Sequence, residues 1–147
     1  MKAASTAINF SVEVVVLPVS DVDRALRFYV DQVGFTLDID YAPNDAFRVV
    51  QLTPPGSGCS IAVGIGISPV KPGTYQGLHL VVEDIEQAIA DLTDRGLELG
   101  EPFHFGEAGQ TPGLHPERAD YGTFVPFSDP DGNGWLLQEV RQRAPGR

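Results

Sequence analysis

Besides 20 acidic residues, this 147-residue chain has only three histidines and one cysteine that could act in catalysis or bind a metal ion, and their spacing forms no familiar catalytic motif. The single cysteine, Cys59, excludes an intrachain disulfide; as a nucleophile it needs a nearby histidine that the sequence does not place. We interpret it as a small apolar residue of the interior. His104 and Glu107 are three residues apart, but no predicted helix puts them on one face. We expect His104 and His115 to lie at the surface or in a lid.

The third histidine, His79, and two glutamines are the stronger candidates for a site. A histidine transfers protons near neutral pH, hydrogen-bonds a ligand or coordinates a metal ion, and it can also be a buried residue that only satisfies its neighbours. Gln51 and Gln138 lie on predicted strands and either bind a ligand or satisfy adjacent backbone groups. The elements that position these side chains decide between the alternatives.

A repeat with a shift of 63 positions organises the chain. The segment from Leu17 to Val22 aligns with the segment from Leu80 to Ile85. Each copy reads as a strand, a turn marked by aspartate and an amphipathic helix with apolar residues at the helical period. The predicted helix caps and glycine stops are Ser20 or Asp21, Gly34 and Gly96.

Strand-like segments separated by turn signals follow each helix. In the first half they are Phe35 to Tyr41, Phe47 to Thr53 and Cys59 to Ile67, with Ala42 to Asp45 as a turn. In the second half they are Leu97 to Phe105, Gly122 to Phe127 and Trp135 to Val140. With a strand before each helix, Val12 to Val19 and Leu78 to Val82, both halves have the order βαβββ. This order predicts an α+β fold with helices outside curved mixed sheets.

These elements divide the chain into two modules that we expect to form one compact domain. The first module covers residues 1–69, a linker covers 70–76, the second module covers 77–141, and 142–147 form a C-terminal tail. Residues 106–121 interrupt the repeat and are predicted to be a long loop without secondary structure. We interpret this loop either as a flap over a pocket or as a plain surface loop.

Three motifs together resemble one known family. They are LPVSDVDRALRFY in the first copy, LVVEDIEQAIADL in the second, and the turn DPDGN before the last strand. The combination resembles the glyoxalase / bleomycin-resistance / extradiol-dioxygenase superfamily, also called vicinal oxygen chelate proteins, over nearly the whole chain. The resemblance implies two modules that enclose a cup-shaped pocket, and commonly a homodimer. It also implies one divalent metal ion held by His and Glu ligands, which two adjacent substrate oxygens chelate.

The positions at which the resemblance implies metal ligands carry other residue types here. They correspond to Val14, Gly77 and Leu136, and to one position in the strand from Cys59 to Ile67, which contains no His, Asp or Glu. We therefore predict neither the usual metal site nor another cofactor.

Some polar and aromatic residues remain next to the missing ligand positions. Because side chains alternate along a strand, His79 and Gln138 share faces with positions 77 and 136 and should point into the cup. Glu139 has the opposite parity and should face the helices or solvent. The predicted ligand-binding residues are His79, Gln138, Gln51, Phe105, Phe124 and Trp135, with core packing as the alternative for Trp135. No catalytic residue is assigned, and His79 is the candidate.

The formal net charge of −10 argues against a nucleic-acid partner and against an anionic membrane surface. No apolar stretch approaches the roughly 20 residues that span a bilayer, and the first residues form a poor secretory signal, so we expect a cytoplasmic protein. Three functions stay open. The first is a metal-free binder of a small organic molecule. The second is a lyase, isomerase or dioxygenase-type enzyme that uses His79 as an acid or base, or that binds a metal ion through other ligands. The third is a non-catalytic regulatory or interaction module.

Overall fold

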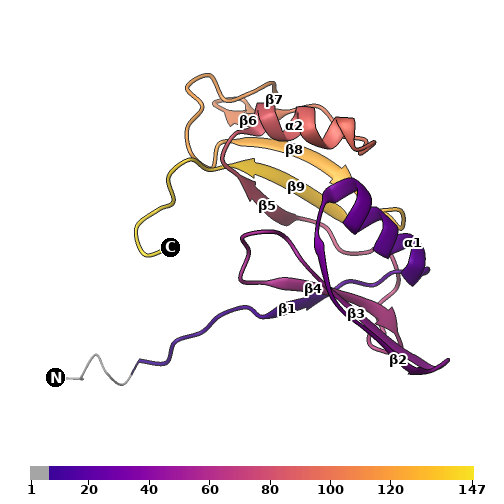
Figure 1. Cartoon of the computed structure of the whole chain (residues 1–147). Helices are drawn as coiled ribbons and strands as arrows, with labels where there is room; N and C mark the ends of the chain where they lie inside the picture. The colour runs from indigo at the N-terminus through magenta and orange to yellow at the C-terminus, as the bar shows by residue number, and fades with distance from the viewer. Residues whose placement is uncertain (1–6) are drawn as a thin grey trace.

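Two mixed sheets, one from each half of the chain, make up the computed structural model, which describes residues 7–147 (Figure 1). Sheet A has the order β1 (Val14–Val16), β4 (Ser60–Ile65), β3 (Phe47–Thr53) and β2 (Thr36–Asn44). Sheet B has the order β5 (Leu78–Val82), β9 (Gly134–Glu139), β8 (Thr123–Ser128), β6 (Phe103–Gly106) and β7 (Gly109–Pro112). In each sheet the first strand pairs in parallel with its neighbour and all other pairs are antiparallel. The predicted α+β class is confirmed.

The helices begin and end as the capping residues predict. In α1 (Val22–Arg27) the side chain of Asp21 accepts a hydrogen bond from the backbone of Arg24, and the chain then continues as a π-helix, η2 (Phe28–Val33). Asp84 caps α2 (Ile85–Asp94) in the same way. Gly34 and Gly96 follow the two helices with φ values of 96° and 89°, a left-handed conformation that favours glycine.

The two modules share one hydrophobic core on the helix-facing sides of both sheets. It contains Val50, Leu52, Ile61 and Val63 of sheet A and Val125, Phe127, Trp135 and Leu137 of sheet B. Side chains of η2, which belongs to the first module, pack on sheet B: the ring of Tyr29 lies 6.0 Å from that of Trp135, and the ring of Phe28 lies 6.4 Å from that of Phe127. The opposite side of each sheet, called the open face below, carries no helix.

The turn between β8 and β9 connects the two modules through buried hydrogen bonds. The Asp129 carboxylate accepts from the Tyr29 hydroxyl at 2.8 Å and from the side chain and backbone of Asn133. Asn133 donates to the carbonyl of Pro18 and accepts from the backbone of Tyr75. The DPDGN motif therefore attaches the last hairpin to the first module and to the linker.

The structure corrects several predicted boundaries. Strand β1 is only three residues long, β2 extends through the predicted turn to Asn44, and the strand expected from Leu97 begins only at Phe103. Residues 106–121 are not structureless, because Gly109–Pro112 forms β7 and pairs with β6 in a hairpin. The sequence does not predict this hairpin, because the glycines at positions 106 and 109 interrupt the alternation of apolar and polar residues that indicates a strand.

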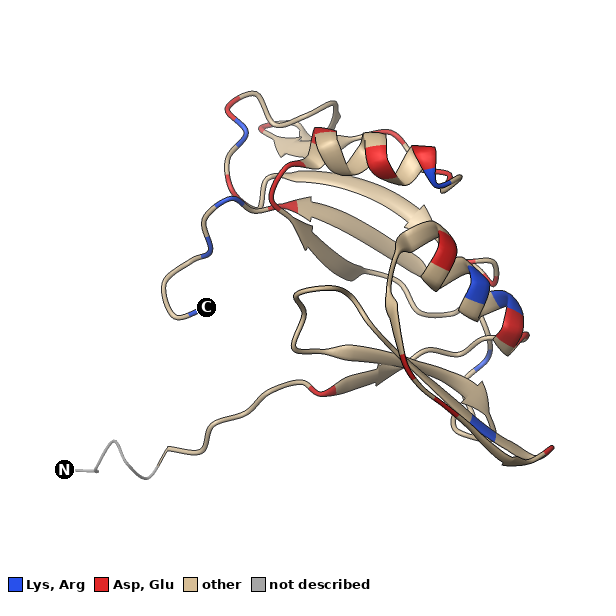
Figure 2. Ribbon diagram, viewed as in Figure 1, with Lys and Arg blue, Asp and Glu red and all other residues tan. Residues whose placement is uncertain are grey.

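Charged side chains gather away from the strands of sheet B (Figure 2). Acidic residues lie along α2 and the connecting loops, α1 carries both acidic and basic residues, and the C-terminal tail carries basic ones. Among the residues that the structure describes, no helix is both long and apolar enough to cross a membrane.

Candidate functional site

His79 and Gln138 lie on the open face of sheet B. In the parallel pairing of β5 with β9, His79 is the register partner of Leu136 and Val81 that of Gln138. Gln138 is in turn the partner of Phe124 on β8. Alternation along β9 puts Leu136 and Gln138 on this half-buried face, while the residues between them are buried. The geometry agrees with the predicted direction of both polar side chains.

An aromatic surface lies beside these two polar residues. The ring of Phe124 packs edge-on against His79 at 6.0 Å and stacks on Phe103 at 5.4 Å. Phe105 joins the group at 5.7 Å from Phe124 and is 59% exposed. Phe124 is only 9% exposed and Phe103 is half-buried, so Phe105 supplies most of the aromatic area that this group offers to a planar ligand.

A pocket of about 560 Å³ opens at the His79 end of this face, and we call it the β5–β9 pocket. Its floor comes from β5 and β9, one wall from the β3–β4 loop and the other from Tyr121 and the C-terminal tail. The lining residues are Pro54, Pro55, Gly56, Ser57, Gly58, Cys59, His79, Leu80, Val81, Tyr121, Gln138, Arg143 and Arg147. A second pocket, of about 520 Å³, lies around the N-terminal end of α1 and contains none of the predicted site residues.

Hydrogen bonds define the polar groups of the pocket. Nδ1 of His79 lies 2.7 Å from the carbonyl of Gly77, so Nδ1 is the protonated nitrogen and Nε2 of the neutral ring is an acceptor. Nε2 of Gln138 donates to the carbonyl of Tyr121 at 3.1 Å. The glutamine therefore satisfies the adjacent backbone, as its structural interpretation predicts, and its amide oxygen remains available as an acceptor.

Trp135 and Gln51 do not join this group. Trp135 is 4% exposed, lies on the helix-facing side of β9 and donates to the Tyr29 hydroxyl at 3.0 Å. The assignment of Trp135 as a ligand-binding residue is corrected, because its parity differs from that of Leu136 and Gln138 and places it in the core. Gln51 lies half-buried on sheet A, paired with Ala62, outside the β5–β9 pocket.

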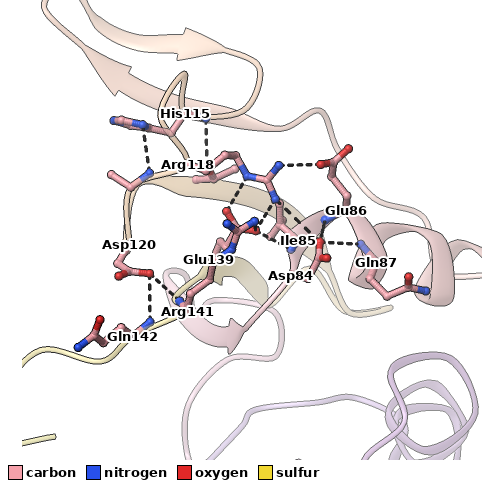
Figure 3. Close-up of polar contacts among 12 residues, drawn as sticks. Asp84, Ile85, Glu86, Gln87, His115, Arg118, Asp120, Glu139, Arg141 and Gln142 are labelled. Atoms are coloured by element: carbon pink, nitrogen blue, oxygen red, sulfur yellow. Dashed lines mark hydrogen bonds and ion pairs between the residues drawn. The ribbon is translucent and has the colours of Figure 1, made fainter.

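The loop that supplies Tyr121 is held by a buried ion pair (Figure 3). Glu139, fully buried at the end of β9, accepts from Nε of Arg118 at 2.7 Å and from the backbone of Ile85 at 3.0 Å. Arg118 also donates to Glu86 at 2.6 Å. Two loop residues, Arg118 and Tyr121, have positive φ values of 51° and 67°, a conformation that these contacts hold in place.

The surroundings of two buried side chains, Glu139 and Tyr29, shift their pKa values. The hydrogen bond from Arg118 holds the pKa of Glu139 below its ordinary value, with help from the backbone of Ile85 and against the effect of burial. Burial and the neighbouring Asp129 raise the pKa of Tyr29, so its hydroxyl remains a donor. Glu139 therefore faces the helices as its parity predicts, and it is a structural carboxylate.

His104 is not a surface residue. It is 8% exposed, and its Nδ1 lies 2.9 Å from the carbonyl of Gly113. Its ring lies 5.8 Å from that of His115, whose Nδ1 accepts from the backbone of Glu117. The expectation of a surface or lid role for His104 is wrong, because the loop folds back over β6 and covers it.

Sequence reasoning missed the loop and tail residues of the pocket. Tyr121, Arg143 and Arg147 lie outside any periodic segment, so no pattern indicates their direction. Cys59, interpreted as an interior residue, is half-buried and lines the pocket. The turn glycines and prolines of residues 54–58 mark a loop, but only the tertiary structure brings that loop to β5.

The residues on this face do not fit the metal centre that the family resemblance implies. Leu136 stands beside His79, and β4 has no His, Asp or Glu from Ser60 to Ile65. Within residues 7–147 no three His, Cys, Asp or Glu side chains lie close enough to hold one ion. The polar side chains of His79 and Gln138 offer one imidazole and one amide oxygen, fewer ligands than a stable divalent site uses.

Two modules of the order βαβββ, the second with the additional strand β7, share one core and have open outer faces. This architecture defines the class of protein. The sequence profile of the Glyoxalase/Bleomycin resistance protein/Dioxygenase superfamily matches residues 11–137, and the chain belongs to this superfamily.

Several proteins are similar over nearly the full chain. TnmS3, an antibiotic binding protein from Streptomyces sp. CB03234, has 32% identity and a TM-score of 0.70, over 92% of this chain and 98% of its own. A superfamily member from Sphaerobacter thermophilus DSM 20745 has 33% identity and a TM-score of 0.67, over 89% and 98%. The protein YetH of Bacillus subtilis (strain 168) is 28% identical over 125 residues, 82% of this chain and 91% of YetH.

Proposed function

We propose that the protein binds a small organic molecule in the β5–β9 pocket, without a metal ion. One observation carries the proposal: His79 and Gln138 stand beside the aromatic surface of Phe103, Phe105 and Phe124, on a face without carboxylates. The pocket combines apolar side chains, such as those of Leu80 and Val81, with a few polar groups, and such a combination is typical of a site that takes up an organic molecule. The similarity to TnmS3, whose description is an antibiotic binding protein, supports this proposal.

A second candidate function is proton-transfer catalysis by His79. The hydrogen bond from Nδ1 to Gly77 favours it, since it leaves Nε2 as an acceptor at the pocket. General acid–base catalysis also uses a group that orients the imidazole or shares its proton, commonly a carboxylate. The pocket lining contains no Asp or Glu, so the binding function is the better supported.

Binding is tested with the fluorescent probe N-phenyl-1-naphthylamine, an uncharged aromatic molecule. We expect saturable binding by the protein. Phe124→Ala and His79→Ala should each weaken it about three- to tenfold, because each removes an aromatic contact or hydrogen bond worth about 0.5–1.5 kcal/mol. Gln87→Ala, on the exposed face of α2 and outside the pocket, is the control and should leave the affinity unchanged. Equal affinity in all variants, with unchanged melting temperatures, would place the binding elsewhere and overturn the proposal.

Metal content tests whether the proposed site works without a metal ion. Protein purified without chelators is expected to contain no stoichiometric divalent ion by plasma mass spectrometry. A stoichiometric ion that disappears in His79→Ala would refute metal-free binding.

We also propose that two copies of the chain form a homodimer through the first module. Residues 7–13 extend away from sheet A (Figure 1), with Ile8 and Phe10 74% and 87% exposed. On the open face of sheet A, Ile39 and Tyr41 are 48% and 55% exposed. Water-exposed apolar groups in such a set are typical of an interface, and in a two-fold symmetric dimer the first module of the second copy offers the same apolar surface as the partner.

Light scattering after gel filtration tests the dimer. The wild-type chain should elute with twice the mass of 15.8 kDa, and Phe10→Ser/Tyr41→Ser should shift it to the monomer. Val70→Ser, which removes an exposed apolar residue of the linker, should leave the mass unchanged. A monomeric wild-type chain at micromolar concentration would contradict the dimer.

A further inference from the structure

The tail that closes one side of the β5–β9 pocket is basic, although the chain as a whole is acidic. Arg143 and Arg147 are two of the 13 lining residues, and none of the 20 Asp and Glu residues is among them. Within the part of the chain that the structure describes, neither guanidinium has an ion-pair partner within 4 Å. The pocket therefore has a positive side in a protein of net charge −10.

Contacts with the loop direct the tail to this position. The carboxylate of Asp120 accepts from the backbone of Arg141 at 2.6 Å and of Gln142 at 3.2 Å (Figure 3). The hydroxyl of Tyr121 then accepts from the backbone of Ala144 at 2.8 Å. Tyr121 itself lines the pocket and accepts from Gln138, so the tail and the pocket floor are joined through one residue.

We infer that the ligand of this pocket is an aromatic or apolar molecule with an anionic group, such as a carboxylate or sulfonate. This inference rests on the proposed function and specifies the chemistry of its ligand. The apolar part lies against Leu80 and Val81 and beside the ring of His79, which Phe124 contacts. The anionic group lies at Arg143 and Arg147, whose planar guanidinium groups suit two-oxygen anions. The absence of carboxylates from the lining removes the local repulsion that the overall charge otherwise imposes.

A matched pair of probes tests the inference. 1-Anilinonaphthalene-8-sulfonate has the ring system of N-phenyl-1-naphthylamine with an added sulfonate. We expect the wild-type protein to bind the sulfonate more tightly, by about three- to tenfold for two exposed charge pairs, and to lose this preference as ionic strength rises. Arg143→Gln/Arg147→Gln should abolish the preference and leave the affinity for the neutral probe unchanged.

The control variant Arg27→Gln/Lys71→Gln removes the same charge from exposed positions outside the pocket and should keep the preference. If the neutral probe binds as tightly as the sulfonate, or if both double variants weaken the sulfonate equally, the inference is overturned while the proposed binding function stands. If neither probe binds, the proposed function fails and the inference fails with it.

Discussion

Replacement of Asp129 by alanine is expected to lower the free energy of unfolding by about 3–5 kcal/mol. Its buried carboxylate accepts from the Tyr29 hydroxyl and from Asn133, and no other acceptor replaces it in the core. Each buried donor left without a partner costs about 1–3 kcal/mol, and at least two are left here. The measurement is urea unfolding followed by the fluorescence of Trp135, the only tryptophan.

Two further variants distinguish the loss of the Asp129 hydrogen bonds from the loss of a negative charge in general. Tyr29→Phe removes one hydroxyl, which leaves Nε1 of Trp135 without its acceptor, and should cost about 1–3 kcal/mol. Asp45→Ala, at an exposed turn, should change stability by less than about 0.5 kcal/mol. A loss below 1 kcal/mol in Asp129→Ala would show that the DPDGN turn does not hold the two modules together.

Replacement of Glu139 by glutamine has the second large expected effect, a loss of about 3 kcal/mol. Removal of one partner of a buried ion pair costs about 3–5 kcal/mol, and the lower value applies because Arg118 remains one-fifth exposed and keeps its bond to Glu86. Glu86→Gln, which changes the exposed partner only, should cost less than about 1 kcal/mol. Tyr121 depends on the same loop, so faster amide exchange in residues 115–122 should accompany the loss in Glu139→Gln.

The stability that Glu139 contributes depends on pH in a defined direction. Arg118 holds the pKa of Glu139 below the ordinary value of 4.5, so the folded state binds the proton less tightly than the unfolded state. This contribution is complete above pH 4.5 and decreases as the pH falls through the folded-state pKa. Glu139→Gln should therefore be less stable than the wild-type protein at pH 7. Its free energy of unfolding should also decrease less than that of the wild-type protein as the pH falls below about 5. An identical acid profile in both proteins would rule out this role.

The local elements could be predicted because their signals lie close together in the sequence. The capping residues Asp21 and Asp84 and the stop glycines Gly34 and Gly96 act through hydrogen bonds within one helical turn. The direction of His79 and Gln138 followed from strand parity, which needs only the register of β5 and β9. The hairpin of β6 and β7 was missed because its glycines and polar residues offer no apolar alternation.

Parity predicts which face a side chain points to, but not which chain segment covers that face. The burial of His104 and the core position of Trp135 depend on the loop of residues 113–122 and on η2, which lie far from them in the sequence. The same holds for Tyr121, whose place at the pocket depends on the Arg118–Glu139 ion pair.

The sequence by itself therefore predicted the repeated order of strands and helix, the family, and a strand face that carries His79 and Gln138. These features depend on periodicity and on contacts between near neighbours. Only the tertiary structure shows that the β3–β4 loop, Tyr121 and the basic tail meet at that face. Contacts between segments that are distant in the sequence produce no periodic pattern of residues from which they could be predicted. It also showed that an acidic chain places arginines, and no carboxylates, around its pocket.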